Sequence, residues 1–155
     1  MIPIRALFEG HLPVSDLQRS MAFFTGVLGL ELAEVVPERK AAFYWIGGRG
    51  QSMLGLWEAG SAPQRTSLHI AFRVELSDLL QAPQRLRAAG VVPRDFYGNP
   101  ADEPVVLASM PAASVYFHDP DGHLLEFLAM LPDLPRPELG VVGWTRWRES
   151  GAAGD

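Results

Sequence analysis

The sequence predicts an α+β fold made of two copies of one β-α-β-β-β plan. A strand pattern with a histidine on its polar face opens each half of the chain, at His11 and at His69. In each half this pattern is followed by an amphipathic helical pattern and then by further strand patterns. A length of 155 residues suffices for one compact domain, or for two small modules that share a core.

In the first half, residues 7–14 form the opening strand of the plan. Ser15 and Asp16 follow as candidate helix caps, and the helix after them carries apolar residues at helical spacing until Gly29 can end it. Further strands are predicted at 30–36, 41–46 and 52–57, with glycines at 47, 48 and 50 marking the last turn.

The second half repeats this order. Residues 68–74 alternate as a strand, Ser77 and Asp78 repeat the cap pattern, and a helix is expected to run to Gly90. Because Pro83 comes early in that helix, the helix should begin near it or kink there. Strands are then predicted at 91–96, 113–117 and 124–129, and the last two are joined by a turn with the sequence Asp119-Pro120-Asp121-Gly122.

We therefore predict that residues 1–130 form a single domain of two modules, about 5–60 and 65–130. The proline-rich stretch 98–112 interrupts the second module as a lid or as a plain linker. Residues 131–155 form a C-terminal extension whose Trp144 and Trp147 should cover an apolar surface of this chain or of a partner subunit. The last few residues are expected to be disordered.

Composition excludes several classes of function. A net charge of −5 and a pI near 5.3 argue against nucleic-acid binding, which favours basic patches. No apolar run approaches the roughly 20 residues that span a bilayer, so no membrane partner is expected. Residues 1–5 lack the long apolar region of a signal peptide, and the chain has no cysteine; a cytoplasmic location is expected.

The chemistry centres on Glu126, the one carboxylate in the otherwise apolar run 124–129. An ionised glutamate costs several kcal/mol to bury unless it is paired or binds a metal, so Glu126 needs a cation. His11, His69 and Glu126 can form a 2-His-1-carboxylate set, which binds a divalent metal and leaves coordination positions open. These ligands permit Fe, Mn, Ni or Zn, and together with the ion they carry a net charge of +1.

Two further residues are candidates for catalysis. Glu9 shares a strand face with His11, either as a base behind the metal ligands or as a carboxylate at the rim. Tyr116 could face the cavity and hydrogen-bond a substrate oxygen, or it could be a core aromatic. In the first half the repeat gives Glu126 a counterpart at Gly55, which has no side chain to ligate, so we predict three protein ligands plus water.

Three motifs carry a family resemblance: HLPVSDLQRSMAFFTGVLGLEL at 11–32, LHIAFRV at 68–74 and VYFHDPDGHLLE at 115–126. With these the chain resembles the vicinal oxygen chelate superfamily of glyoxalase I, fosfomycin-modifying enzymes, extradiol dioxygenases and metal-free bleomycin-binding proteins. The resemblance implies two paired βαβββ modules that form a curved open-barrel sheet around a metal-binding cavity. It also implies ligand roles for His11, His69 and Glu126, and a metal that chelates adjacent substrate oxygens.

The chain departs from each subfamily. Gly55 stands where glyoxalase I has a fourth ligand, and Pro13 stands where fosfomycin enzymes usually have a phosphonate-binding hydroxyl. Extradiol dioxygenases have an acid-base histidine where this chain has residues 107–109, Leu-Ala-Ser. We therefore expect a homodimeric metalloenzyme of the lyase, isomerase or transferase type, acting on a small molecule with adjacent oxygens. The alternatives are a ring-cleaving dioxygenase and a non-catalytic drug-binding protein similar to bleomycin resistance proteins.

Overall fold

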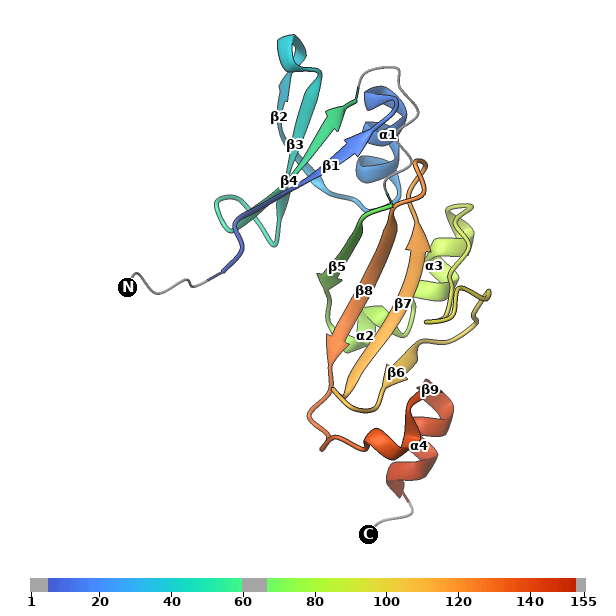
Figure 1. The fold of residues 1–155 in the computed structure, drawn as a ribbon. Coiled ribbons are helices and arrows are strands. Elements are labelled where there is room, and N and C mark those ends of the chain that lie inside the picture. Colours follow the sequence, from blue (N-terminus) through green and yellow to red (C-terminus); the bar gives the residue numbers. More distant parts are fainter. Residues whose placement is uncertain (1–5, 60–66, 153–155) are drawn as a thin grey trace. The chain divides into compact units, whose positions relative to one another are not determined.

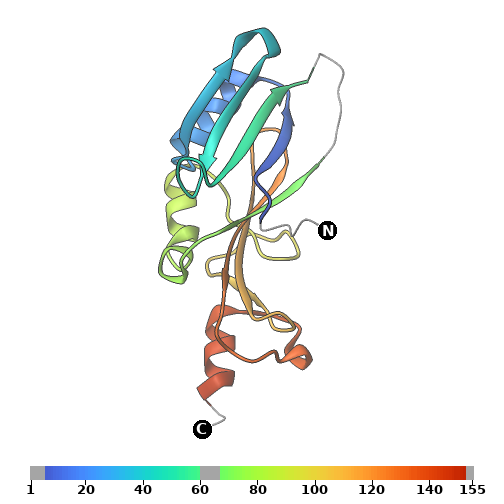
Figure 2. The same ribbon diagram turned by 90° about the vertical axis from the view of Figure 1, so that its left-hand side faces the viewer.

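The computed structural model describes residues 6–59 and 67–152, which divide into two compact units. The first unit contains the described residues up to Leu68 together with Asp119–Gly122, and the second contains the remainder. Each unit carries the predicted order of one strand, helix and three further strands (Figures 1 and 2). The α+β class and the repeated βαβββ plan are therefore confirmed.

The first unit is a four-stranded sheet with one helix. Its strands lie in the order β1-β4-β3-β2; β1 runs parallel to β4, and the other neighbours are antiparallel. Its elements are β1 (Glu9–Val14), α1 (Leu17–Gly26), β2 (Glu31–Val36), the 3₁₀ turn η1 (Pro37–Arg39), β3 (Ala41–Ile46) and β4 (Ser52–Glu58).

Helix α1 follows the predicted signals closely. The Asp16 carboxylate accepts a hydrogen bond from the Arg19 backbone N–H at 2.9 Å, so Asp16 is the N-cap. Leu17, Phe23 and Phe24 form the buried side of the helix. Beyond its end, Gly29 has φ +64° and donates its N–H to the carbonyl of Thr25 at 3.1 Å, a conformation that glycine adopts without steric cost.

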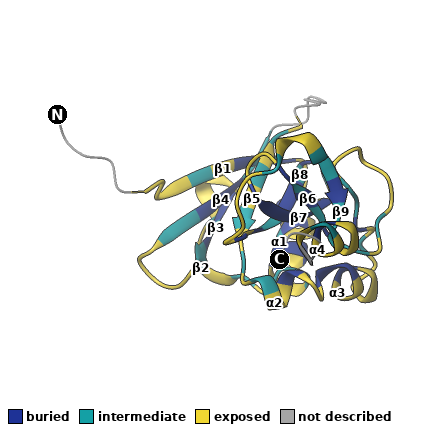
Figure 3. Cartoon of the chain, turned by 90° about the horizontal axis from the view of Figure 1, so that it is seen from below, coloured by how far each residue is buried: buried dark blue, intermediate teal, exposed yellow. Residues whose placement is uncertain are grey.

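The second unit is a five-stranded sheet in the order β5-β8-β7-β6-β9, in which β5 runs parallel to β8. Strand β7 is buried along most of its length (Figure 3). The elements are β5 (His69–Arg73), α2 (Leu76–Leu79), α3 (Ala82–Ala88), β6 (Val105–Leu107), β7 (Ala112–His118), β8 (Leu124–Met130), the 3₁₀ turn η2 (Pro137–Leu139), β9 (Val141–Gly143) and α4 (Trp144–Ala152).

The predicted strand at 91–96 is wrong. Pro93 has no N–H to give to a ladder, and in this run only Arg94 pairs, through isolated bridges to Pro100 and Tyr116. The second strand of the module is instead β6, which lies inside the stretch 98–112 that we expected to be a lid or linker. Three residues bounded by Pro104 are too few for a strand pattern to stand out in the sequence.

The second helix also differs from the prediction at its start. Ser77 and Asp78 lie inside α2 and do not cap it, because the N-cap is Glu75. The helix is interrupted after Leu79, and Pro83 occupies the first turn of a new helix, α3, as its position in the sequence predicted. Proline fits there because the first turn leaves its backbone N–H groups without intrahelical partners anyway.

The C-terminal segment packs on the second unit through β9 and α4. Strand β9 pairs with β6, and α4 contacts both strands. Trp147 is only 2% exposed, so this chain itself provides the surface that the indole covers. The Arg136 guanidinium lies 3.6 Å from the centroid of the Trp147 ring and donates a hydrogen bond to Ser150 Oγ at 2.9 Å.

Some expectations fall outside the described residues. The expectations about a signal peptide, at 1–5, and about disorder at the end of the chain, at 153–155, concern these residues. Within 6–59 and 67–152, no helix is long and apolar enough to cross a membrane.

The turn between β7 and β8 is held by one carboxylate. Asp121 accepts hydrogen bonds from Ser15 N at 3.2 Å, from Ser15 Oγ, from Arg19 Nη2 at 2.8 Å and from Ser20 Oγ at 3.2 Å. Burial works to raise the pKa of Asp121, but the hydrogen bonds from Ser15 and the hydrogen bond and charge of Arg19 outweigh it, and the pKa is lowered. The predicted turn chemistry is confirmed by Gly122, which has φ +88°.

We expect Asp121→Asn to lower the free energy of unfolding by about 1 to 3 kcal/mol at pH 7, because it weakens several charge-assisted hydrogen bonds. A carboxyl whose pKa is lowered on folding stabilises the fold above its unfolded pKa and loses this contribution as the pH falls through its folded pKa. The difference between parent and variant should therefore shrink below about pH 4. Urea unfolding of both proteins at a series of pH values measures this difference in the free energy of unfolding.

The matched control is Asp133→Asn, which removes one carboxylate from an exposed position in the second unit. Its unfolding free energy should stay within about 0.5 kcal/mol of the parent's. Equal stability of parent and Asp121→Asn at pH 7 would contradict the role assigned to this carboxylate.

Candidate metal centre

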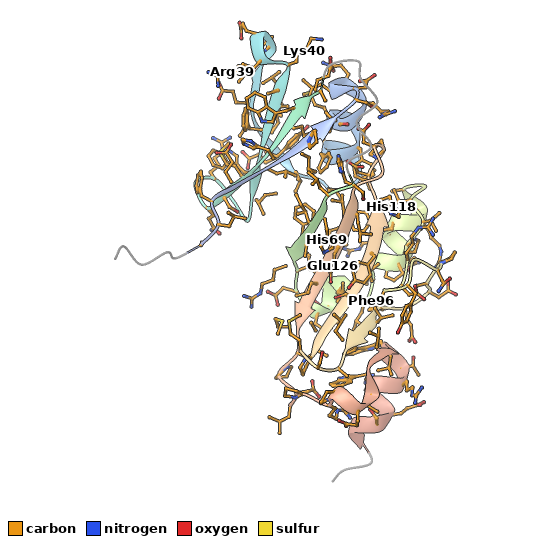
Figure 4. All side chains as sticks on the ribbon, in the orientation of Figure 1. Arg39, Lys40, His69, Phe96, His118 and Glu126 are labelled. Atoms are coloured by element: carbon orange, nitrogen blue, oxygen red, sulfur yellow. The ribbon has the colours of Figure 1, made fainter. Side chains whose placement is uncertain are left out.

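In the second unit the sheet brings His69 and Glu126 together. Strand β5 runs parallel to β8 with His69 opposite Leu124 and Ala71 opposite Glu126, so the two side chains share one face of the sheet. His69 Nε2 lies 3.1 Å from Glu126 Oε2. Figure 4 labels both side chains on neighbouring strands of this sheet.

Both ring nitrogens of His69 face hydrogen-bond acceptors. Nδ1 lies 3.1 Å from the Leu124 carbonyl oxygen and Nε2 lies 3.1 Å from the Glu126 carboxylate, so a neutral imidazole, which has one N–H, can donate to only one of them. When the proton is on Nδ1, Nε2 holds a lone pair directed at the Glu126 carboxylate. A lone pair and an anionic oxygen repel each other, so this arrangement calls for a proton or a metal ion between Nε2 and Oε2.

The two members of the pair differ in their access to solvent. The Glu126 side chain is 6% exposed, whereas that of His69 is 48% exposed. A carboxylate this deeply buried requires a cation or several donors. An ion or ligand can reach the pair from the imidazole side.

Tyr116 lies on β7 directly opposite Glu126. Its ring centroid is 6.3 Å from that of His69, and the residue is 6% exposed. Burial first, and then the negative charge of Glu126, raise the pKa of the Tyr116 phenol to about 12. The phenol therefore stays protonated at neutral pH, and it is both a buried aromatic and a polar group on the face that carries Glu126.

In the first unit, His11 is held by Glu9 and by two aromatic rings. His11 Nε2 donates to Glu9 Oε1 at 2.6 Å, which leaves Nδ1 with the lone pair of the neutral ring. The imidazole centroid lies 6.0 Å from the Phe43 ring and 5.5 Å from the Trp57 ring. Both side chains of the pair are partly open to solvent, at 48% for His11 and 37% for Glu9.

Gly55 lies directly opposite His11 in the parallel pair of β1 and β4. A Cβ at position 55 would stand 2.6 Å from His11 Cδ2 and 3.0 Å from Phe43 Cε1, so the absence of a side chain here makes room for the imidazole. The register also corrects the counterpart that the repeat gives to Glu126. In the second unit His69 pairs with Leu124, and Glu126 comes two residues later. In the first unit His11 pairs with Gly55, so the counterpart of Glu126 in β4 is Trp57 rather than Gly55. Neither residue has a side-chain oxygen to offer a metal.

The predicted site residues thus form two sets. Glu9 and His11 meet in the first unit, and His69, Glu126 and Tyr116 meet in the second. Within either unit, the described His, Cys, Asp and Glu residues form no group of three or more that could hold a metal alone. Sequence reasoning missed Phe96, whose ring lies 6.1 Å from that of Tyr116, because its loop reaches the sheet through a single bridge that leaves no periodic signal.

Comparison with known proteins identifies the family. The family model described as the Glyoxalase/Bleomycin resistance protein/Dioxygenase superfamily matches residues 6–127. The chain belongs to this superfamily. The resemblance stated from the sequence motifs is therefore confirmed.

Three relatives illustrate the range of this superfamily. The metallothiol transferase FosB of Lysinibacillus sphaericus (strain C3-41) is 30% identical over 122 residues, which cover 74% of each chain. The integron cassette protein HFX_CASS4, from the mobile metagenome of the Halifax Harbour sewage outfall, is 35% identical with a TM-score of 0.71, covering 82% of this chain and all of that one. The oxidase ChaP-H2 is 26% identical with a TM-score of 0.64, covering 82% and 94%.

The donors of the second unit fit the divalent metal that such a superfamily member would hold. Two ligands that stand about 2.1 Å from an ion and at right angles to each other are about 3.0 Å apart. The observed separation of His69 Nε2 and Glu126 Oε2 is 3.1 Å. A histidine that binds a metal usually donates the N–H of its other ring nitrogen to a carboxylate, a backbone carbonyl or water. The contact between His69 Nδ1 and the Leu124 carbonyl would play this part and leave the lone pair of Nε2 for the metal.

We expect Gly55→Ala to displace the His11 ring, because the new methyl group would overlap Cδ2. Overpacking of this kind should lower the free energy of unfolding by about 1 to 3 kcal/mol. The imidazole ¹⁵N and ¹H resonances of His11, followed by NMR, would report the displacement.

Gly10→Ala is the matched control, because Gly10 precedes His11 on the same strand and a Cβ there would meet nothing within 4 Å. Unchanged His11 resonances in Gly55→Ala, or an equal change in Gly10→Ala, would contradict the steric role of Gly55.

Proposed function

We propose that this chain is a metal-dependent enzyme of the lyase, isomerase or transferase type that acts on a small molecule with adjacent oxygens. The observation that carries the proposal is the pair formed by His69 and Glu126. One nitrogen of its imidazole lies against a backbone carbonyl, as in many metal-binding histidines, its carboxylate is buried, and the two donor atoms are 3.1 Å apart. A divalent metal ion bound by both side chains would account for all three features.

His11 is proposed as the third ligand. With Nε2 donating to Glu9, the lone pair of His11 is on Nδ1, and Glu9 would then orient the ring and raise its basicity. Two neutral imidazoles and one carboxylate would leave a bound divalent ion with a net charge of +1. Such a centre attracts an anionic substrate, and three protein ligands leave positions for substrate oxygens.

When bound, the metal would act as a Lewis acid toward adjacent substrate oxygens. The chain's own residues add two functions around it. Tyr116, whose phenol is buried on the face that carries Glu126, would donate a hydrogen bond to a substrate oxygen. Glu9 is the exposed carboxylate that could accept a substrate proton, if the substrate replaces its hydrogen bond to His11.

One relative favours a transferase without deciding the substrate. FosB is named a metallothiol transferase, and this name supports a transferase reaction for this chain. Pro13 stands where a phosphonate-binding hydroxyl is expected, which argues for a substrate other than a phosphonate. The proposal includes a homodimer in the cytoplasm, as expected from the sequence.

Metal analysis of the purified protein tests the proposal. We expect near-stoichiometric Fe, Mn, Ni or Zn in the parent, and a loss of metal affinity of about 100-fold or more in His11→Ala, His69→Ala and Glu126→Gln. A loss of this size exceeds the roughly 10- to 100-fold that is typical of outer-shell partners. Iron would favour the ring-cleaving alternative, whereas Zn, Mn or Ni would favour the lyase, isomerase or transferase reaction.

Two variants serve as matched controls. Glu75→Gln removes an exposed carboxylate from the second unit, and His118→Ala removes an exposed histidine at the end of β7. Both should retain the metal, and circular dichroism should confirm that every variant is folded. A parent that takes up none of the four metals would overturn the proposal and leave the non-catalytic drug-binding protein as the leading alternative.

A further inference from the structure

The segment that follows α3 is attached to β7 directly opposite Tyr116. Arg94 N donates to the Tyr116 carbonyl at 2.7 Å, and Tyr116 N donates to the Arg94 carbonyl at 3.0 Å. The chain returns after five intervening residues, and Arg94 forms a second bridge, with Pro100. Residues 95–99, the Asp95 loop, are therefore fixed beside the strand that carries Tyr116.

The Asp95 loop is tied together by its own hydrogen bonds. The Asp95 carboxylate accepts from the backbone N–H groups of Tyr97 and Asn99, both at 2.8 Å, and from Asn99 Nδ2 at 3.1 Å. Arg94 Nη1 donates to the Gly98 carbonyl at 2.6 Å, and Gly98 has φ +85°. A loop held in this way loses little conformational entropy when a ligand binds to it.

This loop leaves two large aromatic residues in water. Phe96 is 49% exposed and Tyr97 is 71% exposed, and their rings meet edge to face with centroids 5.4 Å apart. The Phe96 ring also meets Tyr116, at 6.1 Å, and Tyr116 in turn lies 6.3 Å from His69. The four rings form a continuous row, the aromatic row, that leads from the imidazole of His69 to the solvent (Figure 4 labels Phe96, His69 and Glu126).

From this arrangement we infer that Phe96 and Tyr97 bind the aromatic part of the substrate. Exposed aromatic rings on an internally bonded loop contribute little to the core, but they offer flat apolar surface for a ring to pack against. Because the aromatic row begins at His69, a molecule whose oxygens lie at the His69–Glu126 pair can extend its apolar part along Phe96. The substrate class is thus an aromatic compound with two adjacent oxygens, rather than a small aliphatic one.

This inference rests on the proposed function, since the adjacent oxygens are those that the metal would chelate. Two hydroxamates separate the two ideas. Acetohydroxamate and benzohydroxamate have the same pair of adjacent oxygens. Acetohydroxamate carries a methyl group where benzohydroxamate carries a phenyl ring. Calorimetric titration of the metal-loaded protein should give a tighter dissociation constant for benzohydroxamate by about five- to tenfold, the gain expected from packing one ring face.

Phe96→Ala and Tyr97→Ala should each reduce that preference, and the double variant should abolish it, while the affinity for acetohydroxamate stays unchanged. Leu134→Ala is the matched control, because Leu134 is an exposed apolar residue, at 82%, outside the aromatic row. The control should retain the full preference. No preference in the parent, or the same preference in the double variant, would overturn the inference.

A second measurement separates failure of this inference from failure of the metal proposal. If neither hydroxamate binds to protein treated with metal, the metal proposal is the one that fails. NMR of the metal-free protein then tests the Asp95 loop alone: benzohydroxamate should shift the ring resonances of Phe96 and Tyr97, and acetohydroxamate should not. Resonances that respond to neither compound would overturn the inference for the loop as well.

Discussion

The buried carboxylate of Glu126 is the constraint on which the candidate site depends. Strand β8 carries it in a run of apolar residues, and its side chain is 6% exposed. Such a group needs a cation or several hydrogen-bond donors beside it, because burial removes the water that would otherwise solvate its charge. His69 contacts it, but both ring nitrogens face acceptors, so a neutral imidazole can donate either to the Leu124 carbonyl or to the Glu126 carboxylate and not to both. A proton or a divalent ion between Nε2 and Oε2 would satisfy the carboxylate, and the divalent ion is the one that we propose.

The two units support their histidines in different ways. His69 is fixed by a backbone carbonyl, whereas His11 is fixed by the Glu9 carboxylate and by the rings of Phe43 and Trp57. Gly55 makes room for the His11 ring, since a Cβ there would overlap it. The internal repeat therefore conserves the strand and the histidine, while the groups around each histidine have diverged. Divergence of this kind is expected when one scaffold carries many reactions, because the βαβββ plan sets backbone positions and leaves the neighbouring side chains free to change.

The second unit carries two additions to the repeated plan. The Asp95 loop adds aromatic surface beside Tyr116, and it is rigid because one carboxylate accepts three hydrogen bonds within it. At the far edge of the same sheet, β9 and α4 extend the strands and bury Trp147. Variation between superfamily members is commonly concentrated in such additions, because loops change without disturbing the core. A preference for one substrate class can thus be built by such additions without a change in the βαβββ plan.

The sequence by itself determined the α+β class, the repeat, the cap at Asp16, the Asp119–Gly122 turn and the superfamily, because each depends on local patterns or on motifs. It also singled out His11, His69 and Glu126, since a charged residue in an apolar strand stands out. Only the tertiary structure decided that β6 is the second strand of the second module, and that Trp57 rather than Gly55 corresponds to Glu126. It alone decided which acceptors the two nitrogens of His69 face and that Phe96 contacts Tyr116. These features depend on strand register and on contacts between distant residues, neither of which is encoded in local periodicity.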